Sequence, residues 1–424
     1  MTSKAPDMST VAEKILASHS GHDEVHSGEI VKAEIDFAFM PALTAALSFY
    51  AMYDMGIDKV WDRDRVTILL DHIAPATNIT NSSLHKECRE IAKEQSLRHF
   101  YDINVGVCHQ VIPEKGHVYP GMLMVGADSH TCTHGAFGAF ATGIGSTDMG
   151  AAMGTGKLWF KVPETIRVNA EGRLGPRVMS KDVILKTAKE LGADGATYCS
   201  LEFTGSTVKD MSVGARMTLC NMAIELGAKT GIVEPDDETF RFLEGRVKHG
   251  YTPVYSDADA VYRKTLEIDG AALEPQVACP HAVDNVKSVT EVAGKAVNQV
   301  FIGSCTNGRL EDLQAAAEIM KGKRIHPDVR VIATPASYEV YDAANRQGII
   351  KTLMDAGAVV CNPSCSVCFG GNHGILAPGE VGLSTSNRNF RGRQGSTESY
   401  VYLCSPATAA ASALTGVITD PREG

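Results

Sequence analysis

Two cysteines separated by two residues give the clearest sign of metal or redox chemistry in this chain. The segment Cys365–Cys368 is a C-x-x-C motif. By itself it is compatible with a redox pair, half of a zinc site, half of an iron–sulfur site, or coincidence. A redox pair should open a helix, but the following Phe369–Gly371 is poor helix sequence. A structural zinc site needs four nitrogen or sulfur ligands, and the sequence contains no second C-x-x-C pair.

A third cysteine, Cys305, lies well upstream and directly follows the apolar run 299–303, where a strand is predicted. Three thiolates can hold a [4Fe–4S] cluster and leave one iron without a protein ligand, and that iron can act as a Lewis acid on a substrate. We therefore predict Cys305, Cys365 and Cys368 as cluster ligands. The cysteines expected to pack as small apolar residues are Cys199, Cys361 and Cys404.

Histidines and carboxylates form a second candidate set. Asp71 and His72 follow the apolar run 65–70, and the segment Asp128–His130 follows the run 121–126. His109 and Glu202 are further candidates for moving a proton or orienting an imidazole. Any one of these residues read alone is more often a core group or a turn cap. The set His109, Asp128 and His130 also allows a zinc hydrolase, whose site keeps three protein ligands and an open position.

The segment 386–393 is rich in Asn and Gly and carries Arg388, Arg391 and Arg393. Two guanidinium groups could each bind a substrate carboxylate through paired hydrogen bonds. The alternative is a solvated basic loop. Asn307, close to Cys305, is a further candidate for bonding to a substrate or to a cluster sulfur.

Alternating apolar runs and helical segments must position these residues. Strands are predicted at 299–303, 329–333 and 358–360, with helices over 311–320 and 337–356 between them, which is the pattern of a parallel α/β sheet. Polar residues gather beyond the strand ends, where open α/β sheets bind ligands. The expected organisation is three α/β domains around a central cleft, covering residues 1–162, 163–285 and 286–424.

Length and composition narrow the class of protein. A chain of 424 residues is too long for one ordinary core, and a net charge of −10 argues against a nucleic-acid partner. The uncharged segment 37–53 approaches the length of a membrane span, but it contains Pro41 and is flanked by aspartates, so we predict a buried helix and no membrane association. Eleven cysteines without a secretory signal indicate a reducing, cytoplasmic location.

Several of these segments together resemble the aconitase superfamily and, more narrowly, the large subunits of 3-isopropylmalate dehydratase and homoaconitase. The likeness runs from about Thr10 to Pro421. The segments that carry it are Gly126–Thr131, Gly143–Asp148, Gly303–Asn307, Cys365–Cys368, Ser386–Arg393 and Tyr402–Thr408.

The resemblance implies an aconitase-like iron–sulfur fold and a hydro-lyase that reversibly dehydrates a hydroxy-dicarboxylate, in the first place 3-isopropylmalate. The catalytic residues it implies are Asp71, His72, His109, Asp128, His130 and Glu202, with Asp128 paired to His109 and Glu202 paired to His130. The substrate-binding residues it implies are Ser129, Asn307, Arg388 and Arg393. Homoaconitase and 2,3-dimethylmalate dehydratase are alternatives within the same chemistry, and an RNA-binding regulator without a cluster is the alternative outside it.

Single-chain aconitases continue into a swivelling domain that carries a serine base and further arginines. We therefore expect a separate small subunit to supply the base that takes the C–H proton. Two positions depart from the family pattern. Pro41-Ala42 stands where relatives carry a polar pair, and Ser366-Val367 stands between the paired cysteines where relatives commonly carry Gly-Pro. The first change would suit a less polar substrate.

Overall fold

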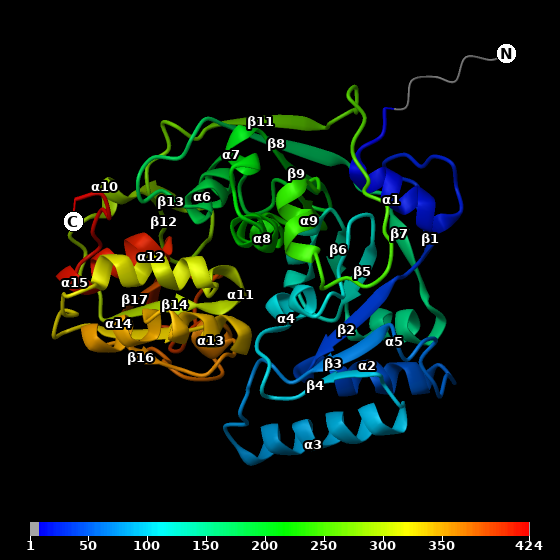
Figure 1. Ribbon diagram of the computed structural model, residues 1–424, viewed down its shortest axis with the longest axis horizontal. Coiled ribbons are helices and arrows are strands. Elements are labelled where there is room, and N and C mark those ends of the chain that lie inside the picture. The colour runs from blue at the N-terminus through cyan, green and yellow to red at the C-terminus, as the bar shows by residue number, and fades with distance from the viewer. Residues whose placement is uncertain (1–7, 424) are drawn as a thin grey trace.

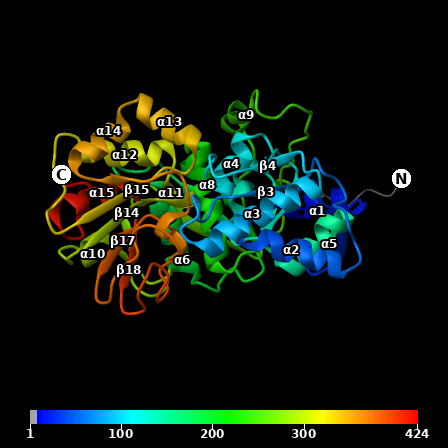
Figure 2. The same ribbon diagram turned by 90° about the horizontal axis from the view of Figure 1, so that it is seen from below.

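The computed structural model describes residues 8–423 and contains three sheets of mainly parallel strands, with a two-stranded antiparallel ribbon beside them. The C-terminal elements lie at one end of the molecule, the N-terminal elements at the other, and residues near 200 between them (Figures 1 and 2). The helices of the first half are α1 (Val11–Ser20), α2 (Ala42–Asp54), α3 (Ile79–Glu94), α4 (Cys108–Glu114), the 3₁₀-helix η1 (His130–Phe137), α5 (Ser146–Thr155) and α6 (Ser180–Leu191). The later helices are α7 (Ser206–Lys209), α8 (Val213–Asn221), η2 (Met222–Leu226), α9 (Asp237–Leu243), α10 (Val289–Val292), α11 (Ser304–Asn307), α12 (Leu310–Met320), α13 (Tyr338–Arg346), α14 (Ile349–Ala356), η3 (Ser366–Phe369) and α15 (Pro406–Thr415).

The first sheet is wholly parallel. Its order is β4 (His99–Tyr101), β3 (Val66–Leu69), β2 (Phe37–Pro41), β5 (Leu123–Gly126) and β6 (Phe140–Gly143). Every residue of β2, β3 and β5 is buried, because structure covers both faces of the sheet and the strands therefore read as continuous apolar runs. The ribbon pairs β1 (Ile30–Glu34) with β7 (Lys157–Lys161).

The composition of the uncharged segment 37–53 predicts one buried helix, and this prediction is wrong. The segment forms strand β2 and then α2, and the strand ends at Pro41, which precedes the first turn of the helix. Leu47 on α2 is 60% exposed, so this helix is half-buried and lies on the surface. No helix of residues 8–423 has the length and apolar character needed to cross a membrane.

The second sheet is also parallel, in the order β10 (Thr230–Ile232), β9 (Ser200–Thr204), β8 (Thr165–Glu171) and β11 (Lys264–Asp269). One continuous apolar cluster includes side chains of the first and second sheets, among them Phe39, Phe137, Ile166 and Phe203. The two sheets therefore share part of their core.

The third sheet contains the predicted β-α-β-α-β unit, with β14 (Gln299–Gly303), β15 (Arg330–Thr334) and β16 (Val359–Val360) in parallel. The predicted helix over 337–356 is two helices, α13 and α14, because Gly348 adopts a φ of 75° between them. The remaining strands of this sheet are β17 (Val381–Ser384), β18 (Tyr400–Leu403), β12 (Gln276–Ala278) and β13 (Val286–Ser288). Strand β12 thus pairs in the third sheet although it precedes the boundary expected at residue 285.

Gly106 joins the first sheet to the third. It forms an isolated antiparallel bridge with Ser337, and the following amide of Val107 donates to Ala336 O at 2.8 Å. Its φ is +123°, and a Cβ atom there would lie 2.4 Å from Ser337 Cα.

We expect Gly106→Ala to lower the free energy of unfolding by about 3 kcal/mol, since it combines a backbone collision with a left-handed conformation. Gly56→Ala is the control, because Gly56 also has a positive φ but open space around it; its expected cost is about 1 kcal/mol. Thermal unfolding of both variants measures the difference, and equal losses would contradict the steric argument.

Glu114 of α4 reaches the same junction. Its Oε1 accepts hydrogen bonds from Ser337 Oγ at 2.7 Å and from Gln110 Nε2 at 2.9 Å, and burial raises its pKa to about 7. Because the folded state holds this proton more tightly than the unfolded state, stability falls as pH rises from about 4.5 to 7.

Glu114→Gln removes this titration. Between pH 5 and pH 8 the free energy of unfolding of the variant should therefore rise relative to that of the wild type, by up to about 3 kcal/mol. Melting temperatures of both proteins across that range measure the effect. A constant difference at all pH values would show that Glu114 does not titrate in this window.

Candidate active site

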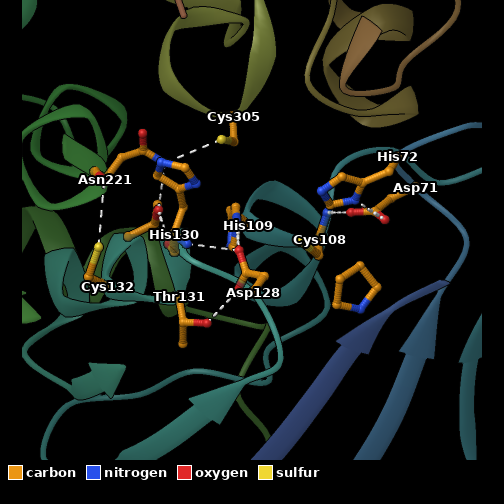
Figure 3. Close-up of polar contacts among 12 residues, drawn as sticks. Asp71, His72, Cys108, His109, Asp128, His130, Thr131, Cys132, Asn221 and Cys305 are labelled. Carbon is orange, nitrogen blue, oxygen red and sulfur yellow. Dashed lines mark hydrogen bonds and ion pairs between the residues drawn. The ribbon is translucent and has the colours of Figure 1, made fainter. Parts of the chain in front are cut away.

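The site lies beyond the carboxyl ends of parallel strands, which is where α/β sheets bind ligands. Strand β3 leads to Asp71 and His72, β5 leads to Asp128 and His130, and β14 leads to Cys305 at the start of α11. Cys305, which comes from the third sheet, faces Asn221 and the histidines of the first sheet across the site (Figure 3). Three segments far apart in sequence therefore converge on one location.

Asp71 and His72 form a bonded pair. His72 Nδ1 donates to Asp71 Oδ1 at 2.7 Å, and Asp71 Oδ2 accepts from the amide of Cys108 at 2.9 Å. Burial alone would raise the pKa of Asp71, but attraction to His72 and these hydrogen bonds outweigh it and lower the pKa. Burial likewise opposes the charge on His72, yet Asp71 raises its pKa above the usual value. The pair favours an imidazolium beside a carboxylate.

The predicted pairing of His109 with Asp128 is present in the structure. Their Nε2 and Oδ2 atoms are 2.7 Å apart, and the amide of His130 donates to the same oxygen at 2.9 Å. The other carboxylate oxygen accepts from Thr131 Oγ1 at 2.5 Å. Burial would raise the pKa of Asp128, but the attraction of His109 and these bonds hold it well below the usual range. Asp128 is therefore a carboxylate that fixes the orientation of His109.

The predicted pairing of Glu202 with His130 is wrong. His130 Nε2 donates to Glu225 Oε1 at 2.7 Å, whereas Glu202, on β9, accepts from Ser256 Oγ and from Tyr262 OH, both at 2.8 Å. The carboxylate of Glu202 thus faces the 256–262 segment and is satisfied there. A sequence signal for Glu225 did exist, because it is the single charged residue in the apolar segment 217–228.

Glu225 also binds Arg388, whose Nε lies 2.7 Å from Oε1 and 3.0 Å from Oε2. Burial would raise the pKa of Glu225, but His130 and Arg388 together lower it. Burial lowers the pKa of His130 despite this carboxylate. The arrangement therefore favours a neutral His130 that donates from Nε2 and keeps a lone pair on Nδ1.

The three motif cysteines are all buried, with exposures of 5%, 6% and 5% for Cys305, Cys365 and Cys368. Two asparagines that the sequence analysis did not single out contact the sulfur atoms of Cys305 and Cys368. Asn221 Nδ2 lies 3.3 Å and Asn387 Nδ2 lies 3.7 Å from Cys305 Sγ. Cys368 Sγ lies 3.6 Å from Asn387 Oδ1. Amide donors aimed at a thiol sulfur suit a thiolate metal ligand.

The spacing of the donor atoms separates a cluster from a single ion. A zinc ion bound at about 2.3 Å brings its sulfur ligands to within about 4 Å of one another, whereas a cluster holds them farther apart. Across residues 8–423, two groups of three donor atoms lie within 4.8 Å of one another, namely Asp71, His72 and Cys365, and Cys108, His109 and Asp128. Neither unites the three motif cysteines, and neither is the zinc set His109, Asp128 and His130. The three thiols therefore fit a cluster better than one ion.

An open cavity of about 570 Å³ lies beside these groups. It is lined by Asp128, Ser129 and Arg388, and also by Lys229 and Ile144. Ser129 and Arg388 therefore both line a cavity in which a substrate could contact them.

The other two predicted substrate residues lie elsewhere. Arg393 stacks over the ring of Phe390, and its charge partly opposes the rise in the pKa of His72, so it lies on the His72 side of the site. Asn307 is fully buried, and its Nδ2 donates to Asp312 Oδ1 at 3.0 Å and to Thr218 Oγ1 at 3.3 Å. The prediction that Asn307 contacts the substrate is therefore not supported, since its amide is used within the protein.

Comparison with known proteins agrees with this geometry. The model of the aconitase family (aconitate hydratase) matches residues 13–296 and 285–416. The chain therefore belongs to the aconitase family, a family of hydro-lyases, and the predicted aconitase-like α/β fold is confirmed.

Similar proteins include several that are named as large subunits. This chain is 56% identical, over 97% of its length and 98% of the relative's, to a probable 3-isopropylmalate dehydratase large subunit of Methanothermobacter thermautotrophicus. It is 55% identical, over 97% of its length and 99% of the relative's, to the 3-isopropylmalate dehydratase large subunit 1 of Methanopyrus kandleri. It is 54% identical, over 92% of its length and 99% of the relative's, to a probable methanogen homoaconitase large subunit of Methanosarcina mazei.

Among solved structures, the holo-form of aconitase X from Thermococcus kodakaraensis aligns with 91% of this chain and 92% of its own, with 14% identity and a TM-score of 0.49.

Proposed function

We propose that this chain is the large subunit of a hydro-lyase that holds a [4Fe–4S] cluster and reversibly dehydrates a hydroxy-dicarboxylate, with 3-isopropylmalate as the substrate. The observation that carries the proposal is the position of three buried cysteines opposite three His–carboxylate pairs. Relatives named for 3-isopropylmalate dehydratase and sharing 56% and 55% identity support this substrate. The 54% identity to a homoaconitase large subunit makes the hydroxy acid whose dehydration gives homoaconitate the second candidate.

Cys305, Cys365 and Cys368 would hold the cluster, with the amides of Asn221 and Asn387 directed at sulfur atoms. When bound, the cluster supplies an iron without a protein ligand that acts as a Lewis acid on the substrate hydroxyl. The chain itself would provide the proton donor for the hydroxyl, the oriented imidazoles and the cations that bind the substrate carboxylates.

His72 is the proton donor for the leaving hydroxyl, since Asp71 favours its charged form. Asp128 holds the ring of His109, and Glu225 holds the ring of His130, so that both imidazoles are fixed before a substrate arrives. Arg388 and Ser129 bind one substrate carboxylate at the cavity, and Arg393 binds a second on the His72 side.

A small subunit completes the site. The large-subunit names of the relatives imply such a partner, and the cavity beside Ser129 and Arg388 is open. We infer that the partner covers this cavity and brings the serine base that removes the C–H proton.

The test is an anaerobic assay of the chain together with a small subunit from the same genome. Formation and loss of the alkene are followed by ultraviolet absorbance with three hydroxy acids, namely 3-isopropylmalate, 2,3-dimethylmalate and the hydroxy acid whose dehydration gives homoaconitate. Turnover of 3-isopropylmalate by the complex, and not by either chain alone, is the expected result. A preference for the hydroxy acid that gives homoaconitate would replace 3-isopropylmalate as the substrate. No turnover of any of the three hydroxy acids by a cluster-loaded complex would overturn the proposal.

A further inference from the structure

A buried lysine that binds the loop next to the motif cysteines has no assigned role in the proposed reaction. Lys181 is the second residue of α6, and its side chain is 0% exposed. Its Nζ donates to the backbone oxygens of Thr385 at 2.8 Å and of Ser386 at 2.6 Å, and lies 3.4 Å from Asn307 Oδ1. Lys181 therefore links a helix of the second sheet to two loops of the third.

The two carbonyls that it binds belong to the residues just before Asn387 and Arg388. Asn387 contacts the sulfur atoms of Cys305 and Cys368, and Arg388 binds Glu225. Hydrogen bonds to the backbone at residues 385 and 386 fix the position of the chain from which the side chains of Asn387 and Arg388 extend. The position of Lys181 thus determines where the loop presents them.

The charge of Lys181 is unusual for its surroundings. A buried ammonium group is normally paired with a carboxylate or becomes neutral. None of the ion pairs within residues 8–423 includes Lys181, and the adjacent Asp182 instead accepts from the amides of Met179 and Gln276. Burial lowers the pKa of Lys181 to about 8, while attraction to Cys404, Asp312 and Cys368 opposes this change. The hydrogen bonds that Lys181 Nζ makes within residues 8–423 all go to uncharged oxygen atoms.

Three thiolates together with a [4Fe–4S] core carry a net negative charge. A buried cation next to the 385–388 loop is therefore stabilised more in the protein that holds the cluster than in the protein without it. Charge and hydrogen bonds around a cluster also set its reduction potential. A nearby positive charge stabilises the more negative, reduced cluster and raises the potential.

We propose that Lys181 is a positioning residue that fixes the 385–388 loop and supplies the positive charge that compensates the cluster-bound thiolates. This inference rests on the proposed cluster and goes beyond it, because it assigns a charge partner outside the ligand set. Arg309 differs in kind, since it binds the carbonyls of Cys305 and Thr306 within its own loop.

The experiment compares four anaerobically reconstituted proteins, namely wild type, Lys181→Met, Lys181→Gln and Lys181→Arg, with Lys186→Gln as the matched control. Lys186 lies on the same helix but pairs with Glu190 on the surface. For each protein we measure iron and sulfide content, the midpoint potential of the cluster in a spectroscopic redox titration, and the rate of iron release to a chelator.

Lys181→Met and Lys181→Gln should show a lower midpoint potential and at least tenfold faster iron release, while Lys181→Arg and Lys186→Gln keep a potential close to that of the wild type. Complete loss of the cluster from folded Lys181→Met also supports the inference, provided that Lys186→Gln retains it. If Lys181→Met does not fold, the inference is tested by comparing the midpoint potential and the iron release of Lys181→Gln with those of Lys181→Arg. Unchanged potential and iron release in Lys181→Gln would overturn the inference. A wild-type protein that takes up no cluster would instead overturn the proposed function.

Discussion

Replacing Cys305 by serine is expected to remove bound iron and inorganic sulfide from the anaerobically purified protein while the fold stays intact. Cys305 receives two amide contacts, from Asn221 and Asn387, so its thiol is the most strongly oriented of the three. A hydroxyl cannot replace a thiolate in holding iron, and two remaining cysteines do not hold a cluster with one open iron. Iron and sulfide analysis with the visible spectrum measures the effect, which is a fall from about four of each per chain to nearly none.

Cys361→Ser is the matched control. Cys361 precedes the paired cysteines in the same loop and is half-buried, but it makes none of the amide contacts that surround Cys305. The control should keep its cluster. Retention of the cluster in Cys305→Ser would show that Cys305 is not a ligand. Absence of sulfide from the reconstituted wild type would show that the three cysteines bind a different metal or none.

Replacing Glu225 by glutamine is expected to lower kcat about 100-fold or more, because one carboxylate orients both His130 and Arg388. Glutamine has nearly the same shape but loses the charge that holds the guanidinium and fixes the imidazole. The reconstituted complex is assayed with its substrate for kcat and KM, and cluster content is checked in the same samples.

Glu202→Gln separates this effect from the general cost of altering a buried glutamate. Glu202 is 1% exposed, against 10% for the side chain of Glu225, and its partners are Ser256 and Tyr262. This variant should keep kcat within a few-fold of the wild type and lose thermal stability instead. A large loss of kcat in Glu202→Gln with little change in Glu225→Gln would restore the pairing that the sequence suggested and contradict the assignment made here.

The parts of the fold with long, regular patterns could be predicted from the sequence. The strands at 299–303 and 329–333 and the helix between them have strong apolar periodicity, and each is present within a residue or two. The motif residues after strand ends could also be located, because parallel strands bring their carboxyl ends to one edge. The contact between His109 and Asp128 does not follow from that rule, because His109 lies on α4; the family resemblance implied it.

The features that could not be predicted depend on tertiary packing. Glu225 lies in a 3₁₀ turn after α8, and nothing in the local sequence indicates that this turn faces His130. Strand β12 has three residues and pairs antiparallel with β13 and β18. A strand this short gives no sequence pattern from which its pairing in the third sheet could be predicted. Lys181 reads as an ordinary first-turn helix residue, and its role becomes visible only where the loop at 385–386 meets it.

The order of the site along the chain bears on how the protein is made. The three His–carboxylate pairs of the site, from Asp71 to Glu225, precede the first motif cysteine, Cys305, and the arginines of the 386–393 loop come later still. Domains commonly fold in the order in which the ribosome releases them. The half of the site that handles protons can thus be in place while the thiols are still untranslated, and cluster loading belongs to the last stage of synthesis or after it.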